Sequence, residues 1–378
     1  MASVQGGIKL SLLIGPVPVP APVEVVEALS SAKVDAGSGD TQSGFELTFD
    51  LPARSPLRTL FLLAGGGGVI PLMRVVLVVR IGGNAESLID GVVTNVETLP
   101  GQGGVSKLVV KGKDMSALMD FIDLSGIPYP AMPPAVRVLL VLAKYAALGV
   151  IPLVIPSIVE DLPIPVQRIP QQRGSDYAYV TRLAQQAGYV FYLEPGPAPG
   201  TSKAYWGPEI RVGAPQPALS INMDAITNVE ELSFNFDKER KELPIVYFQE
   251  SISKAPIGIP IPDISPLNPP LGLVPPLPPK IKQLNDTAHM SPLSALMTGL
   301  AYAGQHSDSV FGTGRLDVGR YGRLLKSRQL VGVRGAGLPF DGLYYVKSVS
   351  HDIKRGEYKQ SFSLARDALI STFPTVPV

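Results

Sequence analysis

The chain has 378 residues, with 33 Lys and Arg against 32 Asp and Glu, and a formal net charge of +1. This balance gives no general attraction to nucleic acid or to an anionic membrane surface. The absence of cysteine excludes disulfides, thiolate catalysis and thiolate metal ligands. Charged residues make up only 17% of the chain, below the roughly 25% of typical soluble domains, which predicts surface buried against partners or in a membrane. A chain of this length is expected to form two or three domains.

The apolar stretches are too short to cross a bilayer as helices. The two longest, 59–73 and 145–159, are both interrupted by proline, and both fall short of the about 20 residues that a spanning helix needs. We therefore expect no integral membrane insertion. The proline-rich segment 15–22 is also a poor signal-peptide core, so nothing indicates secretion by the general pathway.

The first region, residues 1–112, is predicted to be mainly β. Residues 45–50 alternate apolar and polar side chains as a half-buried strand does. Residues 72–81 and 87–97 are separated by Gly-Gly-Asn, which predicts a hairpin, and 105–111 adds a further strand. A barrel or a sandwich accounts for this pattern.

The second region, residues 113–200, is predicted to be a mixed α/β insertion. Residues 114–122 and 134–148 can form helices, the second with a proline in its first turn and Gly149 after its end. A helix–strand unit completes this region.

That unit is a helix followed directly by an aromatic strand, over 173–195. Ser175 and Asp176 are candidate N-caps, and the apolar residues that follow recur at spacings of three and four, which predicts an amphipathic helix. Gly188 is expected to end the helix, since glycine adopts the left-handed conformation at low cost. The bulky residues 189–193 suit a pleated strand.

The third region, residues 201–378, is again predicted to be mainly β, and strands within 201–240 can complete the first barrel. Predicted strands cover 218–223, 227–237, 243–249, 315–322, 324–334, 342–352 and 357–366, the last two forming a closing hairpin over 342–366, and a helix is predicted at 291–304. The proline-rich insert 255–280 favours polyproline II and is not expected to form a regular ladder. Its apolar residues predict that it lies on its own protein or on a partner.

The search for reaction chemistry finds no convincing site. His289, His306 and His351 lack metal-binding spacing and are each interpreted as surface or loop residues. Ser350, His351 and Asp352 are adjacent on a predicted strand, so they alternate between faces and cannot converge as a triad.

The remaining candidates are equally weak. The run Gly65–Gly68 lacks the GK[ST] ending of a phosphate loop, and the pairs Glu160-Asp161 and Glu230-Glu231 are as common on solvated surfaces as in catalytic sites. We predict no catalytic, cofactor-binding or metal-binding residues, no cofactor and no enzyme activity.

Two segments resemble the phage late-control D and VgrG group of baseplate hub proteins. The first motif comprises Ser175, Asp176, Tyr177, Tyr179, Arg182, Leu183, Gly188, Tyr189, Phe191 and Tyr192. The second, within 342–351 and 358–366, includes Gly342, Tyr344, Tyr345, Phe362 and Arg366 and is similar to the family's closing hairpin. We interpret these residues as structural, with the aromatic residues of the first motif packing rather than binding a ligand.

The resemblance implies a structural hub at the centre of a contractile-tail baseplate, in a phage tail or a phage-derived injection system. It implies two tube-like β-barrels per chain with the mixed region inserted between them, and a homotrimer with pseudo-sixfold symmetry that joins a sixfold tail tube to a threefold spike. The implied partners are further copies of the chain, the tail-tube protein, the spike and other baseplate components, without specific nucleic acid. The protein would be made in the bacterial cytoplasm and incorporated into the particle.

Two features depart from the family pattern. VgrG-type chains continue into further spike domains, whereas this sequence stops at Val378, so we expect the spike to be a separate polypeptide. The insert 255–280 matches no family feature, and we hypothesise that it contacts the spike, the tube or the baseplate periphery. The alternative functions are a tail-associated cell-wall hydrolase and a ring-forming tail-tube protein similar to Hcp; the length of the chain argues against the second.

Overall fold

The computed structural model is mainly β, with 51% of the residues in strands and 17% in helices, which confirms the predicted fold class. The structure describes residues 2–5, 7–37, 42–52, 73–100, 105–157, 169–249, 256–262, 268–276, 280–284 and 292–373, together with a few single positions between these ranges.

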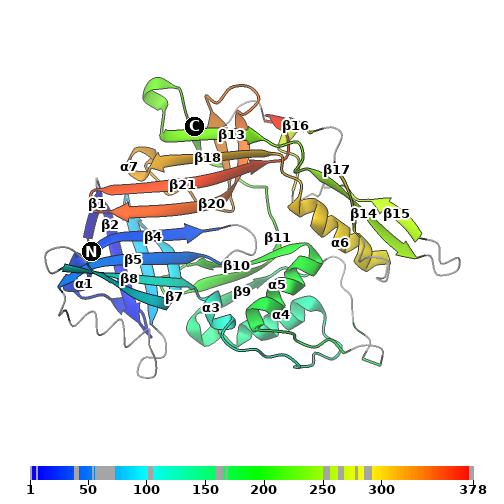
Figure 1. Ribbon diagram of the computed structural model, residues 1–378, viewed down its shortest axis with the longest axis horizontal. Coiled ribbons are helices and arrows are strands. Elements are labelled where there is room, and N and C mark those ends of the chain that lie inside the picture. The colour runs from blue at the N-terminus through cyan, green and yellow to red at the C-terminus, as the bar shows by residue number, and fades with distance from the viewer. Residues whose placement is uncertain are drawn as a thin grey trace.

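A single sheet of 14 strands runs through both β regions (Figure 1). Its N-terminal half consists of β1 (Ala2–Gln5), β2 (Ile8–Gly15), β6 (Arg74–Ile81), β7 (Asn84–Pro100), β8 (Val105–Asp114), β5 (Gly44–Pro52) and β4 (Leu29–Ala36), in that order, with β3 (Val19–Pro20) beside β2. Its C-terminal half continues with β20 (Gly342–Lys354), β21 (Glu357–Arg366), β18 (Val310–Asp317) and β13 (Val229–Phe236), and β19 (Leu330–Arg334) links β12 (Gln216–Ser220) to β20.

The two halves are joined where β4 pairs with β20, from Ser31 opposite Lys354 to Ala36 opposite Val349. Separate tube-like barrels were expected from the sequence, but the pairing among the described strands closes neither half into a ring. The physical reason is that β4, the last strand of the N-terminal half, pairs its remaining backbone groups with β20 of the closing hairpin, so it presents no free edge to close a ring. A pairing across more than 300 residues of chain leaves no local sequence signal.

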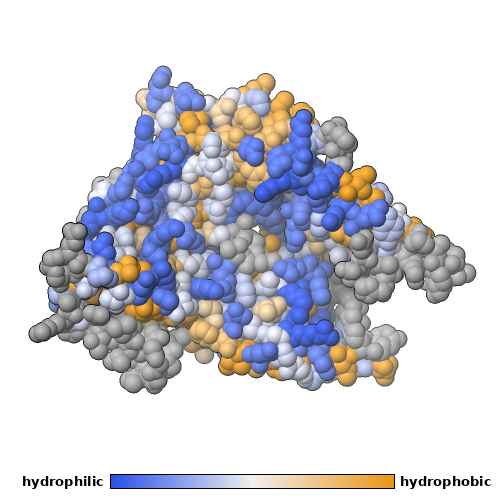
Figure 2. Space-filling view, in the orientation of Figure 1, coloured by the Kyte–Doolittle hydropathy of each residue, from blue (hydrophilic) through white to orange (hydrophobic). Residues whose placement is uncertain are grey.

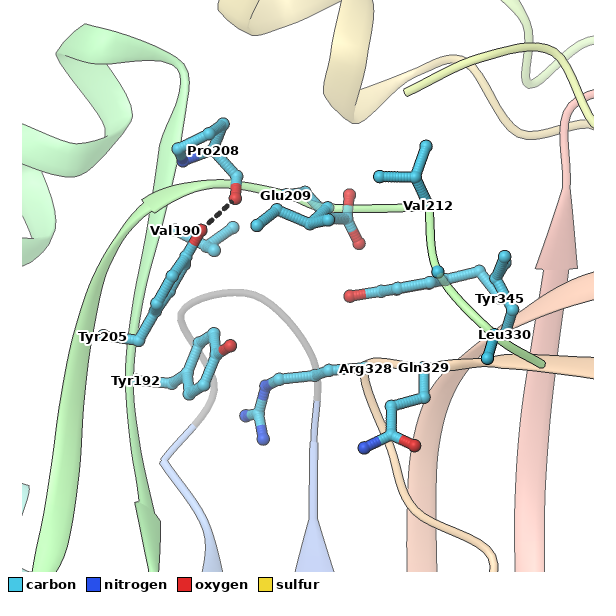
Figure 3. Close-up of a pocket in the computed structure, with 13 residues that line it drawn as sticks. Val190, Tyr192, Tyr205, Pro208, Glu209, Val212, Arg328, Gln329, Leu330 and Tyr345 are labelled. Carbon is cyan, nitrogen blue, oxygen red and sulfur yellow. Dashed lines mark hydrogen bonds between the residues drawn. The ribbon is translucent and has the colours of Figure 1, made fainter. Parts of the chain in front are cut away.

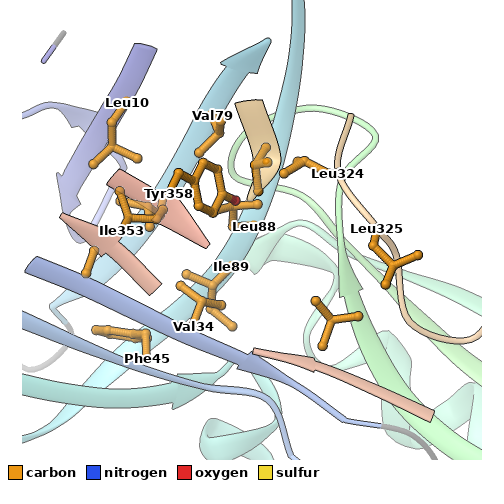
Figure 4. Close-up of a cluster of buried hydrophobic side chains, with 14 of the residues drawn as sticks. Leu10, Val34, Phe45, Val79, Leu88, Ile89, Leu324, Leu325, Ile353 and Tyr358 are labelled. Atoms are coloured by element: carbon orange, nitrogen blue, oxygen red, sulfur yellow. The ribbon is translucent and has the colours of Figure 1, made fainter. Parts of the chain in front are cut away.

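The two halves of the large sheet share one hydrophobic core. In β5 the apolar residues alternate, so that Phe45 and its neighbours at every second position face inward. Figure 4 shows Val34 and Phe45 from the first region beside Ile353 and Tyr358 from the last. The two β regions are therefore stabilised by the same buried side chains.

The mixed region has a core of its own. Helices α4 (Pro134–Ala143) and α5 (Asp176–Ala187) cover one face of a three-stranded sheet in the order β10 (Tyr189–Pro195), β11 (Ser202–Pro208), β9 (Val150–Val154). Val180, Phe191 and Trp206 are buried between helices and sheet. Strand β11 lies beyond residue 200 but completes this sheet by pairing with both neighbours.

The predicted helix–strand unit is confirmed in detail. The Ser175 hydroxyl accepts a hydrogen bond from the backbone N–H of Ala178 at 3.2 Å, and Gly188 ends the helix with φ of +70°. The predicted helix 134–148 is shorter, since α4 stops at Ala143 and a 3₁₀ turn precedes Gly149.

Three other predictions need correction. The helix expected at 114–122 is reduced to α3 (Ser116–Met119), because β8 extends to Asp114, whose carboxylate accepts the backbone N–H of Ser116. The strand expected at 315–322 is β18 followed by the short helix α7 (Val318–Tyr321), capped by Asp317. The helix α1 (Val23–Ala28) was not predicted.

The proline-rich insert also forms strands where none was expected. β15 (Pro256–Pro260) pairs with β14 (Glu242–Gln249), and β16 (Gly272–Val274) pairs with β22 (Leu369–Ser371). Proline is tolerated in β15 because it is an edge strand. On the other side of β14 lies β17 (Lys280–Leu284), and the predicted helix α6 (Pro292–Gln305) packs against this sheet, which projects at the right of Figure 1.

Within the described ranges, no helix combines the length and the apolar character needed to cross a membrane.

Candidate functional site: two junctions of the mixed region

The mixed region is attached to the large sheet by Arg74 of β6. Its Nε and Nη2 atoms both lie 2.6 Å from carboxylate oxygens of Asp90 on β7, and these side chains are only 5% and 0% exposed. The same guanidinium donates to the carbonyl oxygens of Leu148 at 2.8 Å and Gly200 at 2.7 Å. Because a buried charge is stabilised only when it is paired and hydrogen-bonded, this junction is electrostatically complete.

A second junction encloses a cavity of about 300 Å³. One wall is the face of the small sheet that carries no helices, another is the segment 209–214, and the third is the β19–β20 side of the large sheet (Figure 3). It is lined by Val190, Tyr192, Tyr205, Pro208, Glu209, Ile210, Val212, Gly213, Ala214, Arg328, Gln329, Leu330 and Tyr345. The volume lies at the lower end of the range of small-ligand pockets.

The two family-like motifs meet in this cavity. Tyr192 comes from the first motif and Tyr345 from the second, and Figure 3 shows the Tyr345 hydroxyl directed into the cavity. Burial raises the pKa of Tyr192 to about 12, although Arg328 opposes that rise, and burial raises the pKa of Tyr345 further. Both hydroxyls are therefore protonated at neutral pH. Tyr192 lines the cavity, and that the aromatic residues of the first motif pack rather than bind a ligand stays a prediction.

Behind Tyr345 lies a buried ion cluster. Arg211 donates to both carboxylate oxygens of Asp308, at 2.5 and 2.9 Å, and to Glu209 at 3.3 Å. Lys347 Nζ lies 3.2 Å from Asp308 and 3.4 Å from Glu209. Burial by itself would raise the pKa of both carboxyl groups, but the two cations hold both pKa values below their usual range. This part of the wall is charge-balanced.

Arg328 is not balanced in this way. It has a left-handed backbone with φ of +62°, held by its N–H donating to the Val346 carbonyl at 2.8 Å. The guanidinium carbon lies 3.8 Å from the centre of the Tyr192 ring. Its Nε and Nη2 atoms are buried and have no hydrogen-bond partner in the part of the chain that the structure describes. Burial lowers the pKa of this guanidinium, against the opposite effect of Tyr192 and Tyr345.

The other residues of the first motif build the interior of the mixed region. Asp176 is buried and accepts hydrogen bonds from Lys144 at 3.0 Å, Tyr145 at 2.8 Å and Gln172 at 2.7 Å. The Ser175 hydroxyl donates to Asp120. Leu183 and Phe191 lie in the core, Tyr177 packs at 6.0 Å from the Phe191 ring, and Arg182 donates to the Arg173 carbonyl.

The second motif fixes the chain reversal before β20. The fully buried Arg366 donates to the carbonyl oxygens of Pro339 at 2.6 Å, Ala368 at 2.7 Å and Asp341 at 2.9 Å. Its guanidinium lies 4.4 Å from the centre of the Tyr344 ring. Gly342 has φ of +121°, and a Cβ there would come within 2.0 Å of Ser371. Phe362 belongs to the main core.

The ionic residues of both junctions were missed by sequence reasoning. Arg74 and Asp90 lie on neighbouring strands, but Asp308 lies 97 residues from Arg211, and the ring on which Arg328 stacks belongs to Tyr192, in a distant segment of the chain. In a chain with 17% charged residues, charges inside apolar segments such as 72–81 were the one usable signal. The sequence does not indicate which of these charged residues are paired.

We next report where the structure places the residues that were considered as possible reactive or metal-binding groups. His351 is buried, which corrects its interpretation as a surface or loop residue; its Nδ1 lies 2.8 Å from the Tyr358 hydroxyl, and burial lowers its pKa to about 4. Glu230 pairs with Arg315 and Lys359. Gly65–Gly68, Glu160-Asp161 and His289 lie outside the described residues. Across the ranges that are described, no group of three His, Asp or Glu side chains could hold a metal ion.

Comparison with solved structures shows that the fold is that of phage tail proteins. A tail protein from Neisseria meningitidis superposes with a TM-score of 0.64 at 14% identity, over 96% of this chain and 97% of that chain. A 43 kDa tail protein of prophage MuSo2 from Shewanella oneidensis gives 0.60 at 14% identity, over 96% and 100%. At such identities the likeness concerns the fold alone.

The same fold extends to secretion systems. An E. coli component of the type VI secretion system, described as structurally similar to two tail proteins of bacteriophage T4, superposes with a TM-score of 0.55 at 12% identity, over 97% of this chain and 79% of that chain. No family model and no curated protein sequence matches the chain.

Proposed function

We propose that the protein is a structural baseplate hub of a contractile phage tail or a phage-derived injection system. The observation that carries this proposal is the superposition on two phage tail proteins over nearly the full length of all three chains. The likeness therefore includes the mixed region as well as the β regions. Incorporation into a tail particle is the role that such a fold supports best.

An uncovered apolar helix face supports a role in assembly. Val136, Leu139 and Leu140 lie on one side of α4 and are 41%, 43% and 46% exposed, while the opposite side is buried in the core. A helix that is apolar all round is typical of a fully buried position. Figure 2 shows apolar residues along the lower margin of the molecule, where Figure 1 places α3 and α4.

In the proposed assembly, three copies surround a common axis and each contributes two β units, residues 1–112 and 201–378, with 113–200 inserted between them. The six units would match a sixfold tail tube on one side, and the trimer would match a threefold spike on the other. A spike protein, the tube protein and other baseplate components are the proposed partners. The two motifs would then serve to position the mixed region on its subunit.

The native mass of the purified protein, alone and with tube and spike proteins, tests this proposal. We expect three copies in the complex with tube or spike. A stable hexamer, or a monomer that never associates with either partner, would argue against the hub. A zymogram on bacterial cell walls separates the hub from a hydrolase, because a hub leaves the cell walls intact.

A further inference from the structure

The Tyr345 hydroxyl is the starting point. The residue is only 3% exposed, and Figure 3 shows its hydroxyl directed into the cavity between the mixed region and the β19–β20 side of the large sheet. Burial raises its pKa, nearby charges act on it more weakly, and no hydrogen bond to another described residue contributes. Unlike the enclosed Nε atom of Arg211, this hydroxyl opens on a space that a guest can enter. Because a buried hydroxyl without a partner is unfavourable, an acceptor from outside the described residues is expected here.

Other tyrosines of the chain indicate which acceptor suits this hydroxyl. Tyr205, Tyr321 and Tyr344 each donate to a backbone carbonyl oxygen 2.7 Å away. Tyr205 lines the same cavity and is bonded to Pro208, so it shows the satisfied state of the same group. Tyr345 lacks such a carbonyl oxygen among the described residues.

The charges around the cavity disfavour a charged guest. A carboxylate would face Glu209, which lines the cavity, and would find no open guanidinium edge, because the Nε and Nη2 atoms of Arg328 are enclosed. A cation would meet three positive side chains against two carboxylates, namely Arg211, Lys347 and Arg328 against Asp308 and Glu209. A neutral guest avoids both conflicts.

The surroundings of Tyr345 strengthen its hydroxyl as a donor. The guanidinium carbon of Arg211 lies 5.0 Å from the centre of the Tyr345 ring, and Lys347 Nζ lies 5.5 Å from it. Positive charge close to a phenol in a buried site favours donation of its proton in a hydrogen bond. Since burial raises the pKa of Tyr345, the oxygen still keeps its proton at neutral pH. The guest should therefore present an acceptor oxygen.

The size and the walls of the cavity favour an organic guest over water alone. Its volume of about 300 Å³ equals the share of about ten water molecules in the liquid. The walls include Val190, Ile210, Val212 and Leu330, which offer such water few hydrogen-bond partners. An apolar group that carries one carbonyl oxygen would cover these walls and satisfy Tyr345.

We propose that this cavity is a receptor for a neutral amide carbonyl borne on a small apolar group, with the Tyr345 hydroxyl donating to the carbonyl oxygen. The rings of Tyr192 and Tyr205 serve as side walls. The amide can belong to a free small molecule or to a segment of a second copy of the chain.

Tyrosine labelled with ¹³C at Cζ in the full chain provides a direct readout, with N-methylpyrrolidone as the probe. This cyclic amide has an acceptor oxygen, an apolar ring and no N–H group. Comparison with Tyr345→Phe assigns the Tyr345 resonance, which the probe should shift in a saturable manner while that of Tyr321 stays unchanged. A Tyr345 resonance that does not respond would show that the cavity holds water only and would overturn the proposal. An equal response to acetate or to tetramethylammonium would overturn the neutral class of the guest.

Two tyrosine variants test the role of the single hydroxyl, with binding followed at the Tyr192 resonance. Tyr345→Phe removes only the donor and should weaken binding of the probe about three- to tenfold. Tyr205→Phe is the matched control, because its hydroxyl is already bonded to Pro208, and its affinity should stay within about twofold of the wild type. Equal affinities of all three proteins, or equal losses in both variants, would contradict the proposal.

A variant that fills the cavity keeps the test decisive if a tyrosine variant folds poorly. Val190→Phe places a larger apolar side chain on the half-buried face of β10 that lines the cavity. We expect it to abolish binding of the probe while its melting temperature without the probe stays close to that of the wild type. Binding that survives in this folded variant would place the probe elsewhere and would overturn the site.

The native mass at increasing protein concentration distinguishes the two sources of the amide. If a second copy supplies it, the wild type associates, and both the probe and Tyr345→Phe weaken that association at least about threefold. If the ligand is a free amide, the probe shifts the Tyr345 resonance while the mass of the wild type stays the same. The proposed hub can fail in the tube and spike assay without affecting binding of the probe.

Discussion

The two junctions of the mixed region use the same residue type in opposite states. At the first, Arg74 binds Asp90 and two backbone carbonyls, so its charge and its main donors are satisfied within the chain. At the second, Arg328 stacks on Tyr192, and its Nε and Nη2 atoms have no hydrogen-bond partner among the described residues. The difference teaches that the first junction is held by a buried ion pair, whereas Arg328 at the second is held by ring stacking and by its own backbone.

Breaking the complete junction is expected to have the largest effect. Arg74→Met leaves Asp90 as an uncompensated buried carboxylate and removes the hydrogen bonds to Leu148 and Gly200. We expect a loss of about 3–5 kcal/mol in the free energy of unfolding, measured by urea titration. The double variant Arg74→Met/Asp90→Leu should recover part of this loss. If the losses of the two single variants add up in the double variant instead, the unpaired Asp90 carboxylate is not the cause of the loss.

The large sheet and the second junction should lose stability at different acid pH values. His351 is buried and neutral, with a pKa lowered by burial to about 4 against an unfolded value of 6.5. The unfolded chain therefore binds more protons between these values, and stability is lost as the pH falls from 6.5 to 4, by up to about 3 kcal/mol.

Asp308 behaves differently because Arg211 and Lys347 keep its pKa below the usual range. Its contribution is present above the unfolded value of 3.8 and is lost only at lower pH. Unfolding measured in urea at several pH values should thus show an early loss that disappears in His351→Gln and a later one that does not. A slope unchanged by His351→Gln between pH 6.5 and 4 would refute this assignment.

Increasing the charge imbalance of the second junction should have a moderate effect. Glu209→Gln leaves Asp308 alone with three cations while keeping the shape of the side chain. We expect a loss of about 1–2 kcal/mol in the free energy of unfolding, measured by urea titration. Glu231→Gln, on the exposed side of β13, is the matched control and should leave this free energy unchanged.

The smallest change in stability is expected on replacing Arg328. Arg328→Met removes a partly buried charge whose Nε and Nη2 atoms have no hydrogen-bond partner among the described residues, so the free energy of unfolding should fall by less than about 1 kcal/mol or should rise. The contrast with Arg74→Met sharpens the comparison, because both variants replace an arginine at a junction by the same apolar residue. A loss as large as that of Arg74→Met would mean that Arg328 is already paired.

Local features were well predicted where their causes lie within a few residues. The capped helix at 176–187, its left-handed end at Gly188 and the aromatic strand after it follow from side-chain type and spacing. The hairpins around Gly82-Gly83 and Gly356 were predicted for the same reason. The proline-rich insert was not, because whether proline disrupts a strand depends on whether that strand lies at an edge.

By itself the sequence determined the mainly β class and most strand and helix positions, since periodicity and capping act over short distances. Tertiary structure alone decided that β4 pairs with β20 and that the two β regions share one core. It also decided that Arg74 is paired with Asp90, whereas two donors of Arg328 have no hydrogen-bond partner within the described ranges. Burial and charge pairing depend on contacts between segments far apart in the chain, and such contacts leave no pattern in either segment.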